Sequence, residues 1–261
     1  MSRTTATPTL TRTGADTITR DSAPPACAPV AAFVAAGLAL AVLSAGTAVL
    51  LLPAAGFAGP GLSLAVMAAV VLTGALALRR AHAHPRLGAA NVVTLVRAAI
   101  AALLAGALAL PGGLADRPTL AWVLVAFVAF GLVLDGVDGW LARRTGLASP
   151  FGARFDMEVD ALLAALLCLV AMQATKAGLW LIPLGFLRYA WLLAGLGLPW
   201  LTRALPDRAG RKTACVVQIA VLTALLAPAV TPPLSVWLAG AATVALVLSF
   251  AVDALWLWRR R

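Results

Sequence analysis

Charge is scarce in this chain, and acidic charge above all. Only 11% of the 261 residues are charged, and Asp and Glu together number ten. A soluble globular domain usually has about a quarter of its residues charged. With 62% hydrophobic residues and a mean hydropathy of +0.97, this chain is predicted to have lipid as the solvent for most of its surface.

Cysteine and histidine are also few. Cys27, Cys168 and Cys215 form no C-x-x-C pair, so we interpret them as small core residues rather than as a disulfide framework or a zinc site. His82 and His84 lie in one basic connection, and two histidines in a loop do not define a metal centre.

The net charge of +10 can accompany nucleic-acid binding. Here, however, the basic residues stand in short clusters between apolar stretches, which is a topology signal, and no nucleic-acid partner is expected.

Apolar stretches dominate the rest of the sequence. A membrane span needs about 20 mostly apolar residues, and eight stretches are candidates: roughly residues 29–52, 61–78, 92–110, 119–141, 157–175, 178–200, 213–229 and 235–257. The predicted fold class is therefore an all-α, polytopic membrane helical bundle of about eight spans. The residues before them, 1–27, are rich in Thr, Ala, Pro and Arg and are predicted to form a disordered cytoplasmic tail.

The basic residues test this count independently. Three or four of them occupy the N-terminal tail, the connections 79–91, 142–156 and 201–212, and the C-terminus, whereas the alternate connections hold one or none. The positive-inside rule then predicts a multi-pass protein with both termini in the cytoplasm. The expected location is the plasma (inner) membrane. The high Ala, Arg and Gly content suggests a bacterial source. Arg97 and Arg188 are exceptions, because they fall within the predicted spans.

Half of the acidic residues lie within 26 positions: Asp135, Asp138, Asp156, Glu158 and Asp160. The first two are three residues apart and share a helix face, as do Asp156 and Asp160, which are four apart. Because the basic loop 143–155 joins the two helices, an antiparallel pair can bring four carboxylates together near the cytoplasmic surface. Glu158, two residues from each neighbour, is predicted to point elsewhere.

Four neighbouring carboxylates repel one another unless cations compensate them. Oxygen ligands without His or Cys suit Mg²⁺, Mn²⁺ or Ca²⁺ rather than zinc, and two such ions can clamp a pyrophosphate. Small residues surround the acids, namely Gly136, Gly139, Ala142 and Gly152. They are explained equally by close helix packing and by clearance for a nucleotide. Arg143 can pair with an acid or with a phosphate.

The stretch from Asp135 to Asp160 reads DGVDGWLARRTGLASPFGARFDMEVD, which is D-x-x-D-G-x-x-A-R-x8-G-x-x-x-D-x-x-x-D without departure. It resembles the signature of the CDP-alcohol phosphatidyltransferase family. The resemblance implies a six-helix catalytic core, residues 89–258, with its active site at the cytoplasmic side. Two additional N-terminal transmembrane helices, residues 28–80, would precede that core.

The resemblance also implies roles for individual residues. Two divalent ions, Mg²⁺ or Mn²⁺, would be bound by Asp135, Asp138, Asp156 and Asp160, and Asp160 would also be the general base. The site for the CDP-lipid would be lined by Gly139, Ala142, Arg143 and Gly152, with Ser149 as a further phosphate or nucleotide contact.

Two shorter matches accompany the main motif. Asn91 to Arg97 reads NVVTLVR and is similar to the family's N-x-x-T-x-x-R, which would turn Asn91 and Thr94 toward the nucleotide. A helix N-cap is an alternative role for Asn91. Gly210-Arg211-Lys212-Thr213 with Gln218 resembles, with shifted basic positions, a motif of phosphatidylglycerophosphate-type members.

The acceptor pocket is predicted from basic residues: Arg188, Arg211 and Lys212. Positive-inside signalling is the alternative for Arg211 and Lys212, and a structural pair with a core acid is the alternative for Arg188. The implied reaction transfers a phosphatidyl group from CDP-diacylglycerol to an alcohol and releases CMP. The acceptor expected is a phosphorylated polyol such as glycerol phosphate or inositol phosphate.

The family often forms homodimers, so a second copy of the chain is a candidate partner besides the bilayer and the two substrates. The alternative function is a non-catalytic or transport-type membrane protein with an intramembrane acidic cluster that binds metal. A transporter should have acids near mid-membrane in several spans, whereas here they cluster at one end of one helix pair.

Overall fold

The computed structural model describes residues 27–81, 87–145, 149–174, 176–203, 205 and 209–260, and all the regular elements in these ranges are helices. The α-helices are α1 (Cys27–Leu51), α2 (Ala58–Ala81), α3 (Ala89–Ala107), α4 (Pro118–Thr145), α5 (Pro150–Gln173), α6 (Leu181–Gly197), α7 (Ala209–Leu226) and α8 (Leu234–Trp258). Short 3-10 turns lie at Pro53–Ala55, Gly178–Trp180 and Pro199–Thr202. Each α-helix overlaps one predicted apolar stretch, so the predicted all-α helical bundle is confirmed.

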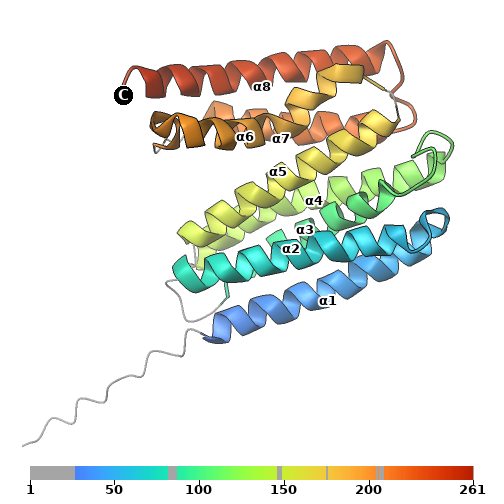
Figure 1. Cartoon of the computed structure of the whole chain (residues 1–261), viewed down its shortest axis with the longest axis horizontal. Helices are drawn as coiled ribbons and strands as arrows, with labels where there is room; N and C mark the ends of the chain where they lie inside the picture. Colours follow the sequence, from blue (N-terminus) through green and yellow to red (C-terminus); the bar gives the residue numbers. More distant parts are fainter. Residues whose placement is uncertain are drawn as a thin grey trace, which may run out of the picture.

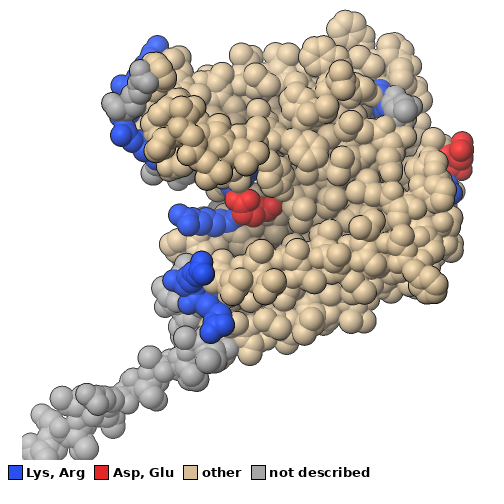
Figure 2. All heavy atoms as spheres, viewed as in Figure 1, with Lys and Arg blue, Asp and Glu red and all other residues tan. Residues whose placement is uncertain are grey.

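The helices have the length and surface of a membrane bundle. Within the described part of the chain, five segments are long and apolar enough to cross a membrane: Ala28–Leu51, Ala58–Arg80, Ala89–Ala107, Gly178–Gly197 and Leu234–Trp258. Shorter apolar helical segments are Pro118–Leu134 and Thr213–Leu226. α5 differs because its first three turns carry Arg154, Asp156, Glu158 and Asp160. Figure 2 shows an uncharged belt between two charge-bearing ends, as a polytopic membrane protein requires.

The two ends of the bundle differ in charge. α1 begins and α8 ends on the same side of the stack (Figure 1). On that side, Nη1 of Arg203 donates a hydrogen bond to the carbonyl oxygen of Arg260 at 2.5 Å. This bond links the segment after α6 to the end of α8. Among the basic residues whose side chains are described, Arg79, Arg80, Arg154, Arg203, Arg259 and Arg260 lie at helix ends on this side, and Arg117 and Lys176 lie on the other. We still predict from this asymmetry that the first side faces the cytoplasm.

α3 is the central helix. It packs against α1, α2, α4 and α5, and 67% of its apolar window is buried, compared with 22–33% for the other long candidate spans. It also belongs to both hydrophobic clusters of the bundle. The larger cluster joins α3 to α4–α8, and the smaller one joins it to α1, α2 and the beginning of α5. A polar side chain on α3 is therefore held on several sides.

Candidate active site

α5 begins before its apolar stretch because a local cap starts it. Ser149 is the N-cap residue, its Oγ accepts a hydrogen bond from the backbone N–H of Gly152 at 3.0 Å, and Pro150 occupies the first turn. The cap adds polar turns to the helix, and these turns carry Asp156 and Asp160. The predicted contact of Ser149 with a phosphate stays a prediction, since in this structure its hydroxyl caps the helix.

Arg97 of α3 holds the two aspartates of α5. Its Nη1 lies 2.6 Å from Oδ1 of Asp156, and its Nη2 forms an ion pair with Asp160. The Arg97 side chain is only 1% exposed, whereas those of Asp156 and Asp160 are 35% and 24% exposed. One planar guanidinium thus fixes two carboxylates that remain partly open to solvent, a geometry that its fork of N–H donors suits.

This bridging role was missed at the sequence level. The sequence shows Arg97 as a charge inside a predicted span and as the last residue of the N-x-x-T-x-x-R match, but neither feature assigns it to the site. The available signal was its placement, since an arginine within a transmembrane helix usually has a buried partner. The partner itself, 59 residues further along the chain, is not encoded in any local pattern.

The α4 half of the motif is only partly described. Asp135, Asp138, Gly139, Ala142 and Arg143 lie in α4, but their side chains are outside the described part of the structure. The backbone nevertheless places this half near Arg97, because a Cβ added to Gly131 would lie 3.9 Å from Cγ of Arg97. Position 135 is one helical turn further, on the same face as Gly131. α3, which packs against both α4 and α5, is the element between the two acidic pairs.

The residues of the upstream match lie beside the start of α5. Asn91 and Thr94 are both buried, and Thr94 Oγ1 donates to the carbonyl of Ala90 at 3.1 Å. A Cβ at Gly152 would lie 3.0 Å from Oδ1 of Asn91 and 3.3 Å from Oγ of Ser149. Three residues predicted to contact the CDP-lipid, Asn91, Ser149 and Gly152, are therefore neighbours.

One alternative role for Asn91 is wrong. α3 begins at Ala89, its N-cap residue is Gly88, and no side chain caps it. Asn91 is the third residue of the helix, and its backbone N–H donates to Gly88. The helix begins one turn earlier than an Asn91 cap requires, so the buried side chain of Asn91 is not the cap of α3.

The small residues of the motif do not behave alike. Gly152 is tightly packed, as described above, which agrees with close helix packing. A Cβ at Gly136, in contrast, would have no described atom within 4 Å. Packing against the described residues therefore does not explain Gly136, whereas it does explain Gly152.

Glu158 points away from the other acids of α5, as predicted. Its Oε1 accepts from Nη2 of Arg188 in α6 at 2.5 Å, and its side chain is half exposed. Arg188 thus has an acidic partner, although Glu158 is half exposed and is not a core acid. The pair links α5 to α6 next to the turns that carry Asp156 and Asp160.

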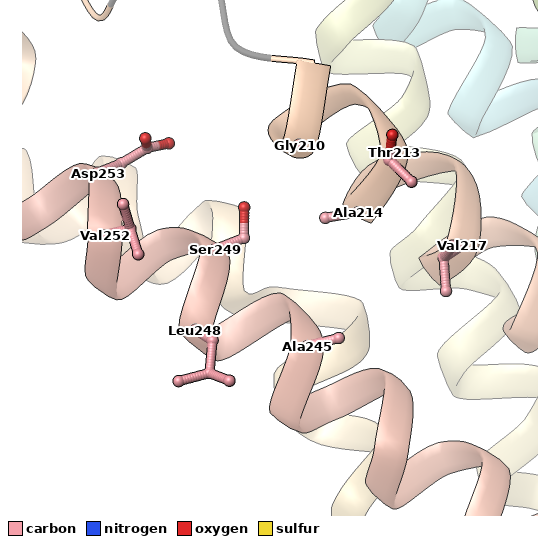
Figure 3. Close-up of a pocket in the computed structure, with 9 residues that line it drawn as sticks. All are labelled: Gly210, Thr213, Ala214, Val217, Ala245, Leu248, Ser249, Val252 and Asp253. Carbon is pink, nitrogen blue, oxygen red and sulfur yellow. The ribbon is translucent and has the colours of Figure 1, made fainter.

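A groove of about 380 Å³ opens between α7 and α8 near their charged ends (Figure 3). Its lining comes from Gly210, Thr213, Ala214 and Val217 of α7 and Ala245, Leu248, Ser249, Val252 and Asp253 of α8. The acids of α5 are not part of this lining, since none of these residues belongs to α4 or α5. Arg211 and Lys212 lie in the first turn of α7, beside Gly210, but their side chains are outside the described part.

Asp156 and Asp160 are suitable ligands for a divalent cation. They offer carboxylate oxygens from one helix face, and oxygen ligands of this kind suit Mg²⁺ or Mn²⁺. Among the described side chains, which do not include those of Asp135 and Asp138, no group of three or more potential metal ligands occurs. The residues present fit a site to which α5 contributes one half, and the complete set of four aspartates stays a prediction.

Comparison with known proteins identifies the family. The family model of CDP-alcohol phosphatidyltransferase matches residues 87–252, which run from the start of α3 into α8. The chain belongs to this family and is a membrane-embedded transferase of that kind, and the family uses divalent metals in general. Comparisons with curated proteins and with solved structures gave no significant match.

Proposed function

We propose that the chain transfers the phosphatidyl group of CDP-diacylglycerol to the hydroxyl of a phosphorylated polyol, such as glycerol phosphate or inositol phosphate, and releases CMP. The observation that carries the proposal is the pair Asp156 and Asp160, held by buried Arg97 within the matched family region. Residues 89–258 would form the catalytic core, and the active site would face the cytoplasm. Phospholipid biosynthesis is the corresponding process.

The proposed chemistry assigns a task to each group. Asp135, Asp138, Asp156 and Asp160 would hold two divalent cations, Mg²⁺ or Mn²⁺, which when bound neutralise the pyrophosphate and the departing CMP. Arg143 would donate to a phosphate oxygen. Asp160 would accept the proton of the acceptor hydroxyl while the hydroxyl oxygen forms a bond to the lipid-proximal phosphorus. The bond from that phosphorus to the bridging oxygen breaks, and CMP leaves with the electron pair.

The arrangement of the helices supports a proposed position for the CDP-lipid. Asn91, Thr94, Gly139, Ala142, Ser149 and Gly152 are proposed to surround the nucleotide of the CDP-lipid. The neighbourhood of Asn91, Ser149 and Gly152 at the starts of α3 and α5 supports this assignment. The acyl chains would remain in the bilayer. A homodimer is compatible with this scheme, but the proposed reaction needs no residue from a second copy of the chain.

The proposal is tested by CMP release. Purified protein should release CMP from CDP-diacylglycerol only with Mg²⁺ or Mn²⁺ and only with one class of alcohol in a panel that includes glycerol phosphate, inositol phosphate, inositol and serine. Asp156→Asn should lose this activity, because it removes a proposed metal ligand. The exposed Arg154→Gln, two residues away, serves as the control. Binding of CDP-lipid without turnover for any alcohol would instead favour a non-catalytic protein.

The acceptor pocket has its own test, which uses the ion pair of α5 and α6. If Arg188 binds the phosphate of the acceptor, Arg188→Met should raise the KM for the acceptor about tenfold or more, since a hydrogen bond to a charged group contributes roughly 1.5–3 kcal/mol. Glu158→Gln, which breaks the same pair but leaves the arginine, should leave that KM near the wild-type value. Equal effects of the two substitutions would show that Arg188 serves only to hold α5 against α6.

A further inference from the structure

The acid-bearing start of α5 is packed by helices outside the family match. Phe151, Phe155 and Val159 follow one another at intervals of four and form one face of α5. All three are buried in the smaller hydrophobic cluster, whose other members come from α1, α2 and α3. Asp156 and Asp160 directly follow Phe155 and Val159 in sequence, so the face that carries the acids adjoins the packed face.

Phe33 of α1 is the centre of this contact. Its side chain is fully buried. Its ring meets the ring of Phe155 edge to face, with centroids 5.3 Å apart and planes at 71°, and it meets the ring of Phe151 in the same way at 6.1 Å and 80°. The rings of Phe151 and Phe155 are stacked on each other at 5.6 Å. An aromatic side chain of α1 thus contacts the first and second turns of α5 at once.

α2 packs against the rings of Phe33 and Phe155 at Gly74, where no space remains for a larger residue. A Cβ added to Gly74 would lie 2.6 Å from Cζ of Phe33 and 3.4 Å from Cε2 of Phe155. Real Cβ contacts are longer than the first of these distances, so a larger residue at Gly74 must displace the Phe33 ring. The position of that ring is therefore fixed by α1, α2 and α5 together.

We propose that α1 and α2 position the catalytic acids, with Phe33 as the positioning residue that sets the rotation of the start of α5. The inference rests on the proposed function of Asp156 and Asp160. Ligand and reacting groups must be held closely, because a misplacement of about 1 Å can cost roughly 100-fold in rate. Arg97 fixes the acids from α3, and Phe33 fixes the adjoining face of the same helix.

The experiment uses the full-length protein in detergent or nanodiscs. Mn²⁺ binding is measured without substrate from the loss of the free-ion signal in electron paramagnetic resonance, and CMP release and thermal unfolding are measured in parallel. Phe33→Ala should weaken Mn²⁺ binding about tenfold or more, the range seen when groups that orient metal ligands are removed, and it should lower kcat.

The matched control lies at the far end of the same hairpin. Leu52 is also fully buried, but it packs next to Gly59 and Gly106, and it is about 28 Å from Phe33 along the helix axis at 1.5 Å per residue. Leu52→Ala should lower the unfolding temperature and leave Mn²⁺ affinity unchanged. Equal weakening of Mn²⁺ binding by both substitutions would overturn the inference, since general loosening would then explain the effect.

A compensation test covers the case in which Phe33→Ala does not fold. Gly74→Ala should impair Mn²⁺ binding by pushing the Phe33 ring, and the added Phe33→Leu, which removes the ring atoms nearest to Gly74, should restore most of it. Absence of any Gly74→Ala effect, or of restoration, would overturn the positioning role.

Asp156→Asn separates the proposed metal site from the proposed positioning role of Phe33. If this variant binds Mn²⁺ normally, the proposed metal site itself fails. If it does not bind while Phe33→Ala binds normally, only the inference fails.

Discussion

Arg97→Met should reduce turnover by about 100-fold or more. The guanidinium is buried and bridges Asp156 and Asp160, so its loss leaves two neighbouring carboxylates without their shared partner, and they repel each other. The loss of orientation alone is of this size when reacting groups move by about 1 Å. The measurement is CMP release at saturating CDP-lipid and metal.

Arg97→Lys sharpens this prediction. Lysine keeps the positive charge but lacks the planar fork that reaches two carboxylates at once, so its turnover should lie between those of Arg97→Met and the wild type. The exposed Arg154→Gln removes a positive charge from α5 without removing the bridge, and it should keep most of the activity. Wild-type turnover in Arg97→Met would show that the bridge is dispensable for catalysis.

Asp160→Asn should also reduce turnover by about 100-fold or more, because a general base contributes roughly this much. The substitution preserves shape and one acceptor oxygen, whereas it removes the proton acceptor proposed for the alcohol. The rate is compared at Mn²⁺ concentrations at which resonance measurements show the metal bound. Near-normal turnover with metal bound would refute the assignment of Asp160 as the base.

Glu158→Gln is the matched control for this second prediction. It lies two residues from Asp160 on the same helix, and its change is chemically the same, but its carboxylate pairs with Arg188 rather than with Arg97. We expect turnover close to the wild-type value. A loss as large as that of Asp160→Asn would mean that the geometry of α5, not the proton acceptor, accounts for both effects.

The sequence predicts local features of this molecule well. Each of the eight apolar stretches overlaps a helix, because hydrophobic runs of this length have few alternatives in a membrane. The spacing of Asp156 and Asp160 also predicts that they lie on the same face of the helix, since four residues are about one helical turn. The family follows from the fixed spacing of the acidic motif, and the family comparison agrees.

Long-range partners could not be predicted in the same way. Arg97 meets Asp156 and Asp160 only because α3 packs against α5. Phe33 is one apolar residue in a run of apolar residues, and nothing in its neighbourhood distinguishes it from the others. The sequence allows Asn91 as a cap, yet α3 begins at Ala89. Helix boundaries are the features that a sequence pattern predicts least well.

The polar start of α5 has a consequence for how water and substrates meet. From Asp160 to the end of α5 at Gln173 the helix rises only about 20 Å at 1.5 Å per residue, whereas the hydrocarbon layer is about 30 Å thick. Acidic atoms accordingly lie in a hollow at this end of the molecule in Figure 2. The proposed reaction would then take place below the membrane surface, where a lipid arrives sideways and the alcohol must descend, and where few water molecules compete with the alcohol for the same phosphorus.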